Sequence, residues 1–417
     1  MKPGYKQTEI GVIPEDWDIG TLKEAFPRLN AGVSVNSDER AVSDYYVLKT
    51  SAVRNGKVNT REAKPVVVSD YPRLKCPVKK GSIIISRMNT PAMVGECGYS
   101  ATDATDTFLP DRLWQVEPSS PDYDFRWLNY LLNTQRYSAA IRATATGTSN
   151  SMKNIAKDQL LEIAVPKPPR PEQERIAEAL SDIDELIASL EKLIAKKKAI
   201  MQGTMQELLT GKRRLPRFTG KWTSHTLGEL GFFTKGSGIG RKDSNSGSIS
   251  AVRYGELYTK HNVFVKQYYS HISKEVASKA LRVFYGDVLF AASGETKEEI
   301  GKCAAIIDNN PVFAGGDILV FRPTCRLDPV FMGLLLNTPQ VCAQRAEKGQ
   351  GDAIVHIHAD ALESITIMLP PYEEQKVIAR IIMDMDYEIC SLDQCLKKGL
   401  KTKEGMMRQL LTGETRI

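Results

Sequence analysis

The sequence PPRPEQERIAEALSD at residues 168–182 returns as PPYEEQKVIARIIMD at residues 370–384. The match extends without a gap and at a constant offset from Ile163–Leu215 to Ile365–Ile417, and both copies close on Leu-Leu-Thr-Gly. Repetition at a fixed spacing indicates two copies of one structural unit. We therefore predict a tandem duplication, in which each unit is a globular segment followed by a matched helix.

Apolar residues recur in both repeated segments at the seven-residue spacing of a coiled coil. The expected seam residues are Leu180, Ile183, Ile187, Leu190, Ile194, Met201 and Leu208 in the first segment, and Ile378, Ile382, Met385, Ile389, Leu392, Leu396, Met406 and Leu410 in the second. Each helix should run about 40 residues, or about 60 Å. This length and the matched register favour a pair of helices over two amphipathic helices that each pack on their own domain.

The two seams are interrupted at Lys197, Thr204, Gly399 and Lys403, so we expect their C-terminal parts to fray or to contact partners. Proline precedes both helices, and Pro171 suits a first helical turn because its missing amide has no partner there. The interruptions do not remove the prediction of two long rods.

Charge is distributed in the same way along both predicted helices, acidic in the first half and basic in the second. The acidic residues are Glu172, Glu174, Glu178, Asp182, Asp184 and Glu185, then Glu373, Glu374, Asp384, Asp386 and Glu388; the basic residues are Lys192, Lys196, Lys197, Lys198, Lys212, Arg213 and Arg214, then Lys397, Lys398, Lys401, Lys403 and Arg408. Antiparallel pairing sets opposite charges together, whereas parallel pairing sets like against like. We predict antiparallel pairing. The alternative, that these charges are only solvated, leaves their shared polarity unexplained.

The segments before the two helices share scattered positions, including Trp17 with Trp222 and Leu-Leu-Asn-Thr at 131–134 and 335–338. Runs rich in β-branched and aromatic residues predict strands at 81–86, 112–116, 286–291 and 317–321. Helices are predicted at 127–137 and 329–348. The expected fold class is α+β, with two pseudo-symmetric α/β domains at 1–167 and 216–369 joined by two long helices at 168–215 and 370–417 that form an antiparallel coiled coil.

An antiparallel pair of duplicated helices would carry the two domains to opposite ends, related by an approximate two-fold axis. Duplex DNA has the same local symmetry, and two readers on a fixed spacer would contact half-sites about one helical turn apart, roughly 34 to 36 Å. The arrangement predicts a bipartite target.

Composition places few limits on this interpretation. A chain of 417 residues is long enough for two or three domains, and its net charge of +6 permits a polyanionic partner without requiring one. No apolar run is long enough to cross a bilayer and residues 1–17 lack a signal-peptide core, so we expect no membrane contact and a cytoplasmic protein. The seven cysteines show no metal-ligand spacing, which suits reduced thiols.

Over its whole length the chain resembles the specificity (S) subunit of type I restriction-modification systems. The resemblance is carried by the opening Ile13-Pro-Glu-Asp-Trp17, by the Pro-Pro-x-x-Glu-Gln-x-x-Ile-Ala blocks at Pro168 and Pro370, and by the two Leu-Leu-Thr-Gly ends. It implies two target-recognition domains, a bipartite asymmetric double-stranded DNA target read one half per domain, and conserved helices. These helices would dock two methyltransferase subunits and, through them, two restriction subunits.

Motifs that imitate catalytic sites are incomplete. Leu369-Pro-Pro-Tyr372 has leucine where an amino-methyltransferase needs Asn or Asp, and the glycines at 236–240 precede a polar segment rather than a helix. His356, His358 and Asp360 alternate along the sequence, but the chain has five histidines and no cysteine nearby, so we expect no metal site there. We therefore expect no catalytic residue, cofactor or metal. The alternatives are a free-standing methyltransferase or endonuclease fusion, and a purely structural coiled-coil adaptor.

Lysine and arginine position phosphates, and polar side chains read base edges in the major groove. We expect such residues on loops after the predicted strands. The DNA-binding candidates are Arg54, Asn55, Lys57, Arg87, Asn89, Thr148, Asn150 and Lys153 in the first domain, and Lys235, Ser237, Arg241, Lys242, Arg253, Tyr254, Lys297 and His356 in the second.

Overall fold

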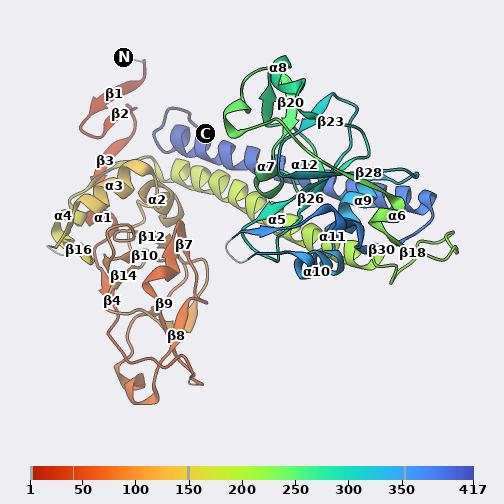
Figure 1. The fold of residues 1–417 in the computed structure, drawn as a ribbon. Coiled ribbons are helices and arrows are strands. Elements are labelled where there is room, and N and C mark those ends of the chain that lie inside the picture. Colours follow the sequence, from red (N-terminus) through yellow and green to blue (C-terminus); the bar gives the residue numbers. More distant parts are fainter. Residues whose placement is uncertain (1–2, 41, 148–150, 352–353) are drawn as a thin grey trace. The chain divides into compact units, whose positions relative to one another are not determined.

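The computed structural model describes residues 3–40, 42–147, 151–351 and 354–417. These form two compact units, unit 1 with residues 1–191 and 394–417 and unit 2 with residues 192–393 (Figure 1). We call the part of unit 1 before the first long helix head 1 (residues 3–167) and the corresponding part of unit 2 head 2 (residues 216–369). Each unit therefore contains one head, part of the first long helix and part of the second.

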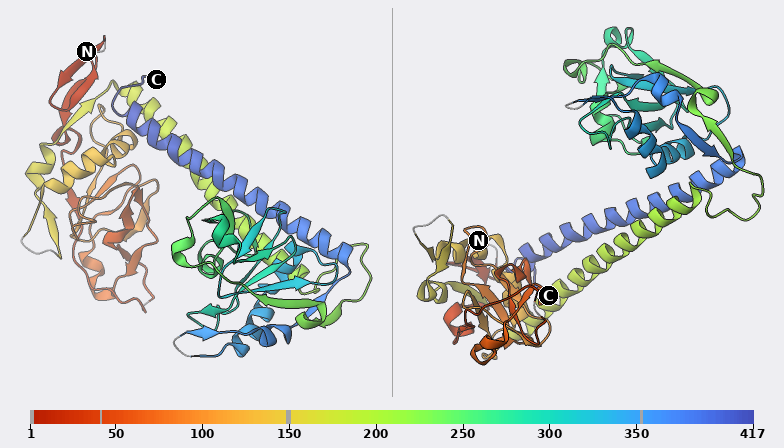
Figure 2. Two further views of the ribbon diagram at one scale, coloured as in Figure 1. Left: turned by 45° about the horizontal axis from the view of Figure 1, so that its top comes forward. Right: turned by 60° about the horizontal axis from the view of Figure 1, so that its bottom comes forward.

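The two long helices are α5 (Arg170–Leu208) and α12 (Tyr372–Leu410), each of 39 residues. In unit 1, Lys403 Nζ lies 2.7 Å from Asp184 Oδ1. In unit 2, Lys197 Nζ lies 2.7 Å from Glu388 Oε1 and Lys198 Nζ lies 3.5 Å from Asp393 Oδ2. Numbering rises along one helix as it falls along the other, and in each unit the two segments lie side by side (Figure 2). The antiparallel coiled coil is confirmed.

None of the expected seam residues is exposed. The buried ones are Leu180, Ile187, Ile194, Leu208, Ile378, Ile382, Ile389 and Leu410, and the half-buried ones are Ile183, Leu190, Met201, Met385, Leu392, Leu396 and Met406. At two interruptions the pairing continues, because Lys197 and Lys403 form ion pairs with the opposite helix. Gly399 leaves room for Ile187, whose Cγ1 would lie 3.4 Å from an added Cβ.

Each head is built on a large twisted sheet whose strand order is matched in the other head. Buried β-branched runs such as Ile83–Ser86 explain the central strands. In head 1 the order is β4 (Asn30–Ala31), β14 (Leu113–Val116), β10 (Ile83–Ser86), β12 (Cys97–Tyr99), β7 (Gly56–Val58) and β6 (Val53–Arg54). In head 2 it is β19 (Gly231–Lys235), β28 (Ile318–Pro323), β24 (Val288–Ala291), β26 (Cys303–Ile306) and β21 (Phe264–Val265).

A second, four-stranded sheet also recurs with matched order. It comprises β8 (Ala63–Pro65), β5 (Tyr46–Leu48), β13 (Ala104–Phe108) and β9 (Pro77–Val78) in head 1, and β22 (Ser270–Ile272), β20 (Ile249–Val252), β27 (Val312–Ala314) and β23 (Leu281–Val283) in head 2. Smaller sheets pair β11 (Met88–Asn89), β16 (Lys153–Ile155) and β15 (Ala145–Thr146) in head 1, and β25 (Ser293–Gly294) with β29 (Val355–His356) in head 2. The remaining pairs are β1 (Tyr5–Thr8) with β2 (Gly11–Pro14), β3 (Asp18–Thr21) with β17 (Ala164–Lys167), and β18 (Thr223–Thr226) with β30 (Thr366–Leu369).

Short helices cover the sheets in the same sequence in both heads. The matched pairs are α1 (Leu22–Ala25) and α6 (Leu227–Leu230), α2 (Phe125–Leu132) and α9 (Pro329–Leu336), α3 (Gln135–Ala143) and α10 (Pro339–Lys348), and α4 (Lys157–Leu161) and α11 (Ala359–Glu363). Head 2 also has α7 (Tyr254–Thr259), α8 (Lys274–Ala277) and the 3-10 turn η3 (Arg241–Asp243), and head 1 has the 3-10 turns η1 (Thr50–Ala52) and η2 (Val68–Arg73).

The four strands expected from sequence are present as β10, β14, β24 and β28, but the two single helices expected at 127–137 and 329–348 are wrong. Each is two helices, broken after Leu-Leu-Asn. Thr134 and Thr338 are extended, with ψ of 154° and 152°, and each begins a new helix as its N-cap. Pro339 enforces this break in head 2, because proline disfavours helical backbone in the residue before it.

The core of each head includes residues of both long helices. In unit 1, Ile176 and Leu180 of α5 and Leu410 of α12 pack with Trp17 and Trp127. In unit 2, Leu208 and Leu209 lie with Ile378 and Ile382 in the core that contains Phe331. A head cannot unfold from the helices without exposing this shared apolar surface.

Candidate nucleic-acid interface and helical junctions

The start of α5 is joined to the chain that follows α12 by an ion pair to a buried carboxylate. Glu172, 3% exposed, accepts from Arg416 Nε at 2.5 Å and from Arg416 Nη2 at 2.8 Å. Trp17 Nε1 donates to the same carboxylate at 3.0 Å. Arg416 also binds Asp16 at 2.7 Å and holds the pKa of that carboxyl below its usual value.

The same ion pair forms in unit 2 between the start of α12 and the chain that follows α5. Arg214 Nε and Nη2 each donate to Glu374 at 2.8 Å, and the guanidinium lies 5.9 Å from the Trp222 ring centre. Glu374 and Arg214 are the repeat equivalents of Glu172 and Arg416. We call this arrangement the Glu-Arg clamp. Each clamp satisfies a buried carboxylate with a cation from beyond the other helix.

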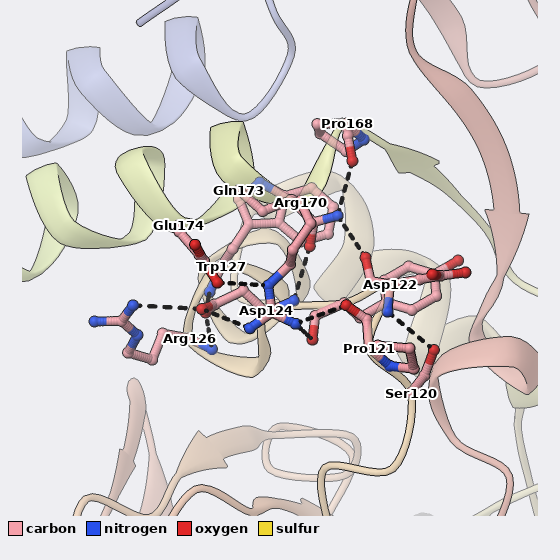
Figure 3. Close-up of polar contacts among 11 residues, drawn as sticks. Ser120, Pro121, Asp122, Asp124, Arg126, Trp127, Pro168, Arg170, Gln173 and Glu174 are labelled. Carbon is pink, nitrogen blue, oxygen red and sulfur yellow. Dashed lines mark hydrogen bonds and ion pairs between the residues drawn. The ribbon is translucent and has the colours of Figure 1, made fainter.

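The glutamine next to each clamp glutamate binds the head of its own unit. Gln173 accepts from the Asp124 amide at 2.8 Å and donates to the carbonyls of Asp122 and Pro168, each at 2.8 Å (Figure 3). Asp124 in turn caps α2 by accepting from two amides of its first turn. Gln375 repeats this, accepting from the Asp328 amide at 3.1 Å and donating to the Pro370 carbonyl at 2.9 Å. We call this contact the Gln latch.

Replacing Arg214 by methionine should lower the free energy of unfolding by about 1–3 kcal/mol, because the buried Glu374 carboxylate loses its charged partner. Arg213→Met is the matched control, since Arg213 is 74% exposed and its ion pair among the described residues is with the exposed Glu207. Its effect should stay within about 0.5 kcal/mol. Urea unfolding of the two variants measures the difference, and equal losses would show that the clamp does not hold Glu374.

A second repeated carboxylate, Asp184 in α5 and Asp386 in α12, is bound differently in the two units. Asp184 accepts from Tyr130 of head 1 at 2.9 Å and pairs with Lys403 of α12. Asp386 pairs instead with Lys266 of head 2. Both heads thus reach the repeated aspartate, with a hydroxyl in one unit and an ammonium in the other.

Three of the DNA-binding candidates of head 1 lie at the tip of the hairpin β6–β7. Arg54, Asn55 and Lys57 are exposed there. Asn55 and Gly56 form the turn, with φ of 51° and 77°, as a two-residue hairpin requires. The buried Asn129 of α2 donates to the Gly56 carbonyl at 2.9 Å and so fixes the tip from below.

Arg87, Asn89 and Lys153 lie together beside the sheet of β11 and β16, where Asn89 and Lys153 are paired residues. Arg87 Nε donates to Asn154 at 3.2 Å, and its guanidinium lies 5.3 Å from the Trp114 ring centre. Asn89 donates to Ser86 Oγ at 3.1 Å. Thr148 and Asn150 lie outside the described residues.

Glu96 links the two groups of head 1. Its carboxylate accepts from the Asn55 amide at 3.3 Å, and its carbonyl accepts from the Ser86 amide at 2.8 Å. Arg142 of α3 donates to the same carboxylate at 2.8 Å. Sequence reasoning missed Arg142 because the helix was expected to end at Tyr137. Glu96 thus connects the hairpin tip at Asn55 with Ser86 and with Arg142 of α3.

The candidates of head 2 fall into two groups. Lys235 ends β19, and Ser237, Arg241 and Lys242 lie on the segment that follows it. All four are exposed, and Ser237 donates to the Lys279 carbonyl at 3.0 Å. This segment packs on the four-stranded sheet through Ile239.

The second group surrounds α7 and the β25–β29 pair. Tyr258 of α7 donates to the Ser293 carbonyl at 3.0 Å, and Ser293 Oγ lies 3.0 Å from His356 Nδ1. Arg253 and Tyr254 begin α7, and Lys297 is exposed on the loop after β25.

Arg253 is held by buried polar groups. Its Nε donates to Ser270 Oγ at 2.9 Å, and Ser270 donates to the Glu256 carboxylate at 2.5 Å. Glu256 is 5% exposed and lies 4.0 Å from Nε2 of the buried His261. Burial lowers the pKa of His261, although the Glu256 charge opposes this.

His261 should make the stability of unit 2 fall in mild acid. Its pKa is lower in the folded than in the unfolded chain, where it is about 6.5. The unfolded chain therefore binds more protons than the folded chain as the pH drops below about 6.5. The free energy of unfolding is highest above that pH and falls as the pH drops toward the lower pKa of the folded chain. Urea unfolding should be measured from about pH 8 to about pH 5, a range that brackets the pKa of the unfolded chain. The free energy of unfolding should decline more steeply with falling pH for the wild type than for His261→Phe. Parallel curves would refute the assignment.

Two further negative observations apply to the described part of the chain. It contains no group of three or more His, Cys, Asp or Glu side chains arranged to hold a metal ion. It also contains no helix both long and apolar enough to span a bilayer. His356 contacts Ser293, and His358 is the residue before α11.

Comparisons with known proteins agree with this geometry. The family model for the type I restriction modification DNA specificity domain matches twice, at residues 14–199 and 219–401. The chain is 24% identical to a putative type I restriction enzyme MjaX specificity subunit of Methanocaldococcus jannaschii, over 99% of this chain and 97% of that one. Solved structures of similar fold are the type I S subunit of M. genitalium (TM-score 0.60, 17% identity, 98% and 99% of the two chains) and the HsdS subunit of Thermoanaerobacter tengcongensis (TM-score 0.51, 15% identity, 97% and 98%).

Proposed function

The chain belongs to the type I restriction modification DNA specificity family, and on this premise we propose that its two heads read the two halves of one bipartite double-stranded DNA target. The observation that carries the proposal is the repeated junction. Both heads are attached by the same Gln latch to helices joined by the same Glu-Arg clamp. Two unlike heads on one duplicated support fit a target with two unlike halves.

The proposed target-recognition domains are residues 1–167 and 216–369, and the helical spacers are residues 168–215 and 370–417. The DNA contacts are proposed to come from the basic and polar residues of the two heads. These are Arg54, Asn55, Lys57, Arg87, Asn89, Thr148, Asn150 and Lys153 of head 1, and Lys235, Ser237, Arg241, Lys242, Arg253, Tyr254, Lys297 and His356 of head 2. Arg142, which shares Glu96 with Asn55, is added to the first set.

The partners proposed for the helices are two methyltransferase subunits, with two restriction subunits bound through them. Leu186, Leu193 and Ile200 support this, because they are exposed at seven-residue spacing on α5 and are 51%, 39% and 46% accessible. Apolar residues on an outer helical face are typical of a protein contact. Catalysis is proposed to belong to these partners, in the cytoplasm, with no cofactor in this chain.

The bipartite target can be tested by reconstituting the chain with its partner methyltransferase and mapping methylated adenines across a genome. We expect a split motif with a constant gap. Exchange of residues 216–369 for the second domain of a relative should change one half of the motif and leave the other half and the gap unchanged. A continuous palindrome, or a change in both halves, would contradict the proposal.

The isolated chain should neither transfer methyl groups nor cleave DNA, and incubation with S-adenosylmethionine or magnesium and plasmid DNA tests this. A free-standing enzyme predicts product in that assay. A structural adaptor predicts that the complex with the methyltransferase binds all sequences equally, with no gain for the methylated motif over a scrambled duplex.

A further inference from the structure

One difference between the two heads lies in the connection between two pairs of matched strands. Strand β5 pairs in parallel with β13, placing Val47 opposite Phe108, and β20 pairs in parallel with β27, placing Ala251 opposite Phe313. Strands β7 and β21 are likewise equivalent, since each pairs in parallel with a matched strand of the large sheet. The chain between these strands therefore spans the same interval in both heads.

We call residues 49–57, which run from the end of β5 through the first two residues of β7, connector 1, and residues 253–263, between β20 and β21, connector 2. Connector 1 forms η1 and then the hairpin β6–β7, which adds an outer strand to the large sheet. Connector 2 instead forms α7, and the large sheet of head 2 ends at β21. One position of the duplicated scaffold thus carries a two-stranded ribbon in one head and a helical turn in the other.

Each connector is held from the buried side and presents polar groups outward. The buried Asn129 binds the Gly56 carbonyl beneath the tip that exposes Arg54, Asn55 and Lys57. In connector 2 Arg253, whose side chain is 30% exposed, binds the buried Glu256 of the same connector and the buried Ser270 of β22. Tyr254 beside it is 42% exposed. Groups that are fixed before binding lose less conformational freedom on contact with a ligand.

The exposed groups have the chemistry of base readers. Asparagine pairs with adenine and arginine with guanine through two hydrogen bonds in the major groove, which admits a two-stranded ribbon. Lys57 next to them suits a backbone phosphate. Glu96 accepts from the main-chain amide of Asn55, and within the described part of the chain the Asn55 carboxamide has no hydrogen-bond partner.

We propose that connectors 1 and 2 are the base-reading elements of the two heads, with Arg54 and Asn55 reading purines in one half-site and Arg253 and Tyr254 reading the other. This inference rests on the proposed function. It assigns the difference between the two half-sites to the scaffold position at which head 1 has the β6–β7 ribbon and head 2 has α7.

The test maps the methylated motif of the reconstituted complex for Asn55→Gly and Arg54→Ala. Glycine keeps the positive φ of the turn, so only the carboxamide is lost. Each variant should relax base choice at one or two neighbouring positions of a single half-site, by about 5- to 150-fold in relative methylation rate. Lys57→Ala should weaken binding to all sequences and reduce the salt dependence by about one ion.

In head 2, Tyr254→Ala should relax only the opposite half-site, and it leaves the buried Glu256 network intact. Arg253→Ala should relax the same half-site, and its urea unfolding midpoint is the check on folding because the variant removes a partner of the buried Glu256. Lys80→Ala is the matched control, because Lys80 is exposed on head 1 outside both connectors.

Two kinds of failure are distinguishable. If the wild-type complex gives a split motif that Asn55→Gly, Arg54→Ala and Tyr254→Ala leave unchanged, or if any of them alters both halves, the connectors are not the readers. If the wild-type complex gives no split motif, the proposed function itself fails.

Discussion

The structure depends on two buried glutamates, one at the start of each long helix. Among the described residues, neither forms an ion pair with a cation of its own helix. Glu172 and Glu374 are 3% and 0% exposed, and a buried carboxylate without a partner is costly. Their cations, Arg416 and Arg214, follow the end of the opposite helix. Parallel helices would bring the two glutamates to one end and both arginines to the other. The antiparallel direction is thus required by two repeated charges.

Between the clamps, the helix pair combines repeated and unlike contacts. Ile187, Ile194 and Ile389 form an apolar seam, whereas Lys197 and Lys403 pair with acidic residues of the opposite helix. These ion pairs are partly exposed, with Lys197 and Glu388 at 33% and 49% and Lys403 and Asp184 at 25% and 17%. Ion pairs that solvent reaches contribute little to stability, but a polar group at a seam restricts register. The apolar contacts therefore stabilise the pair, and the ion pairs restrict which residues stand opposite each other.

The sequence predicted the structural features that the two copies of the duplication share. It found the helices, their direction and the central strands, because these follow from spacing, charge and buried β-branched runs. It missed the breaks at Thr134 and Thr338, since the apolar pattern continues across both helices and only the local capping interrupts it. The connectors could not be predicted, because their sequences differ between the copies and their form depends on contacts to distant residues such as Asn129 and Ser270.

The Gln latch explains how one support can hold two different heads. Gln173 binds the amide of Asp124 and the carbonyl of Asp122, and Gln375 binds the amide of Asp328. These are main-chain groups, which every sequence supplies when the backbone is kept. The head must retain the cap of α2 or α9 and the apolar contacts beneath it, while its outer side chains are free to change. Attachment and recognition therefore use different parts of the head, so that a connector can be replaced without loss of the junction.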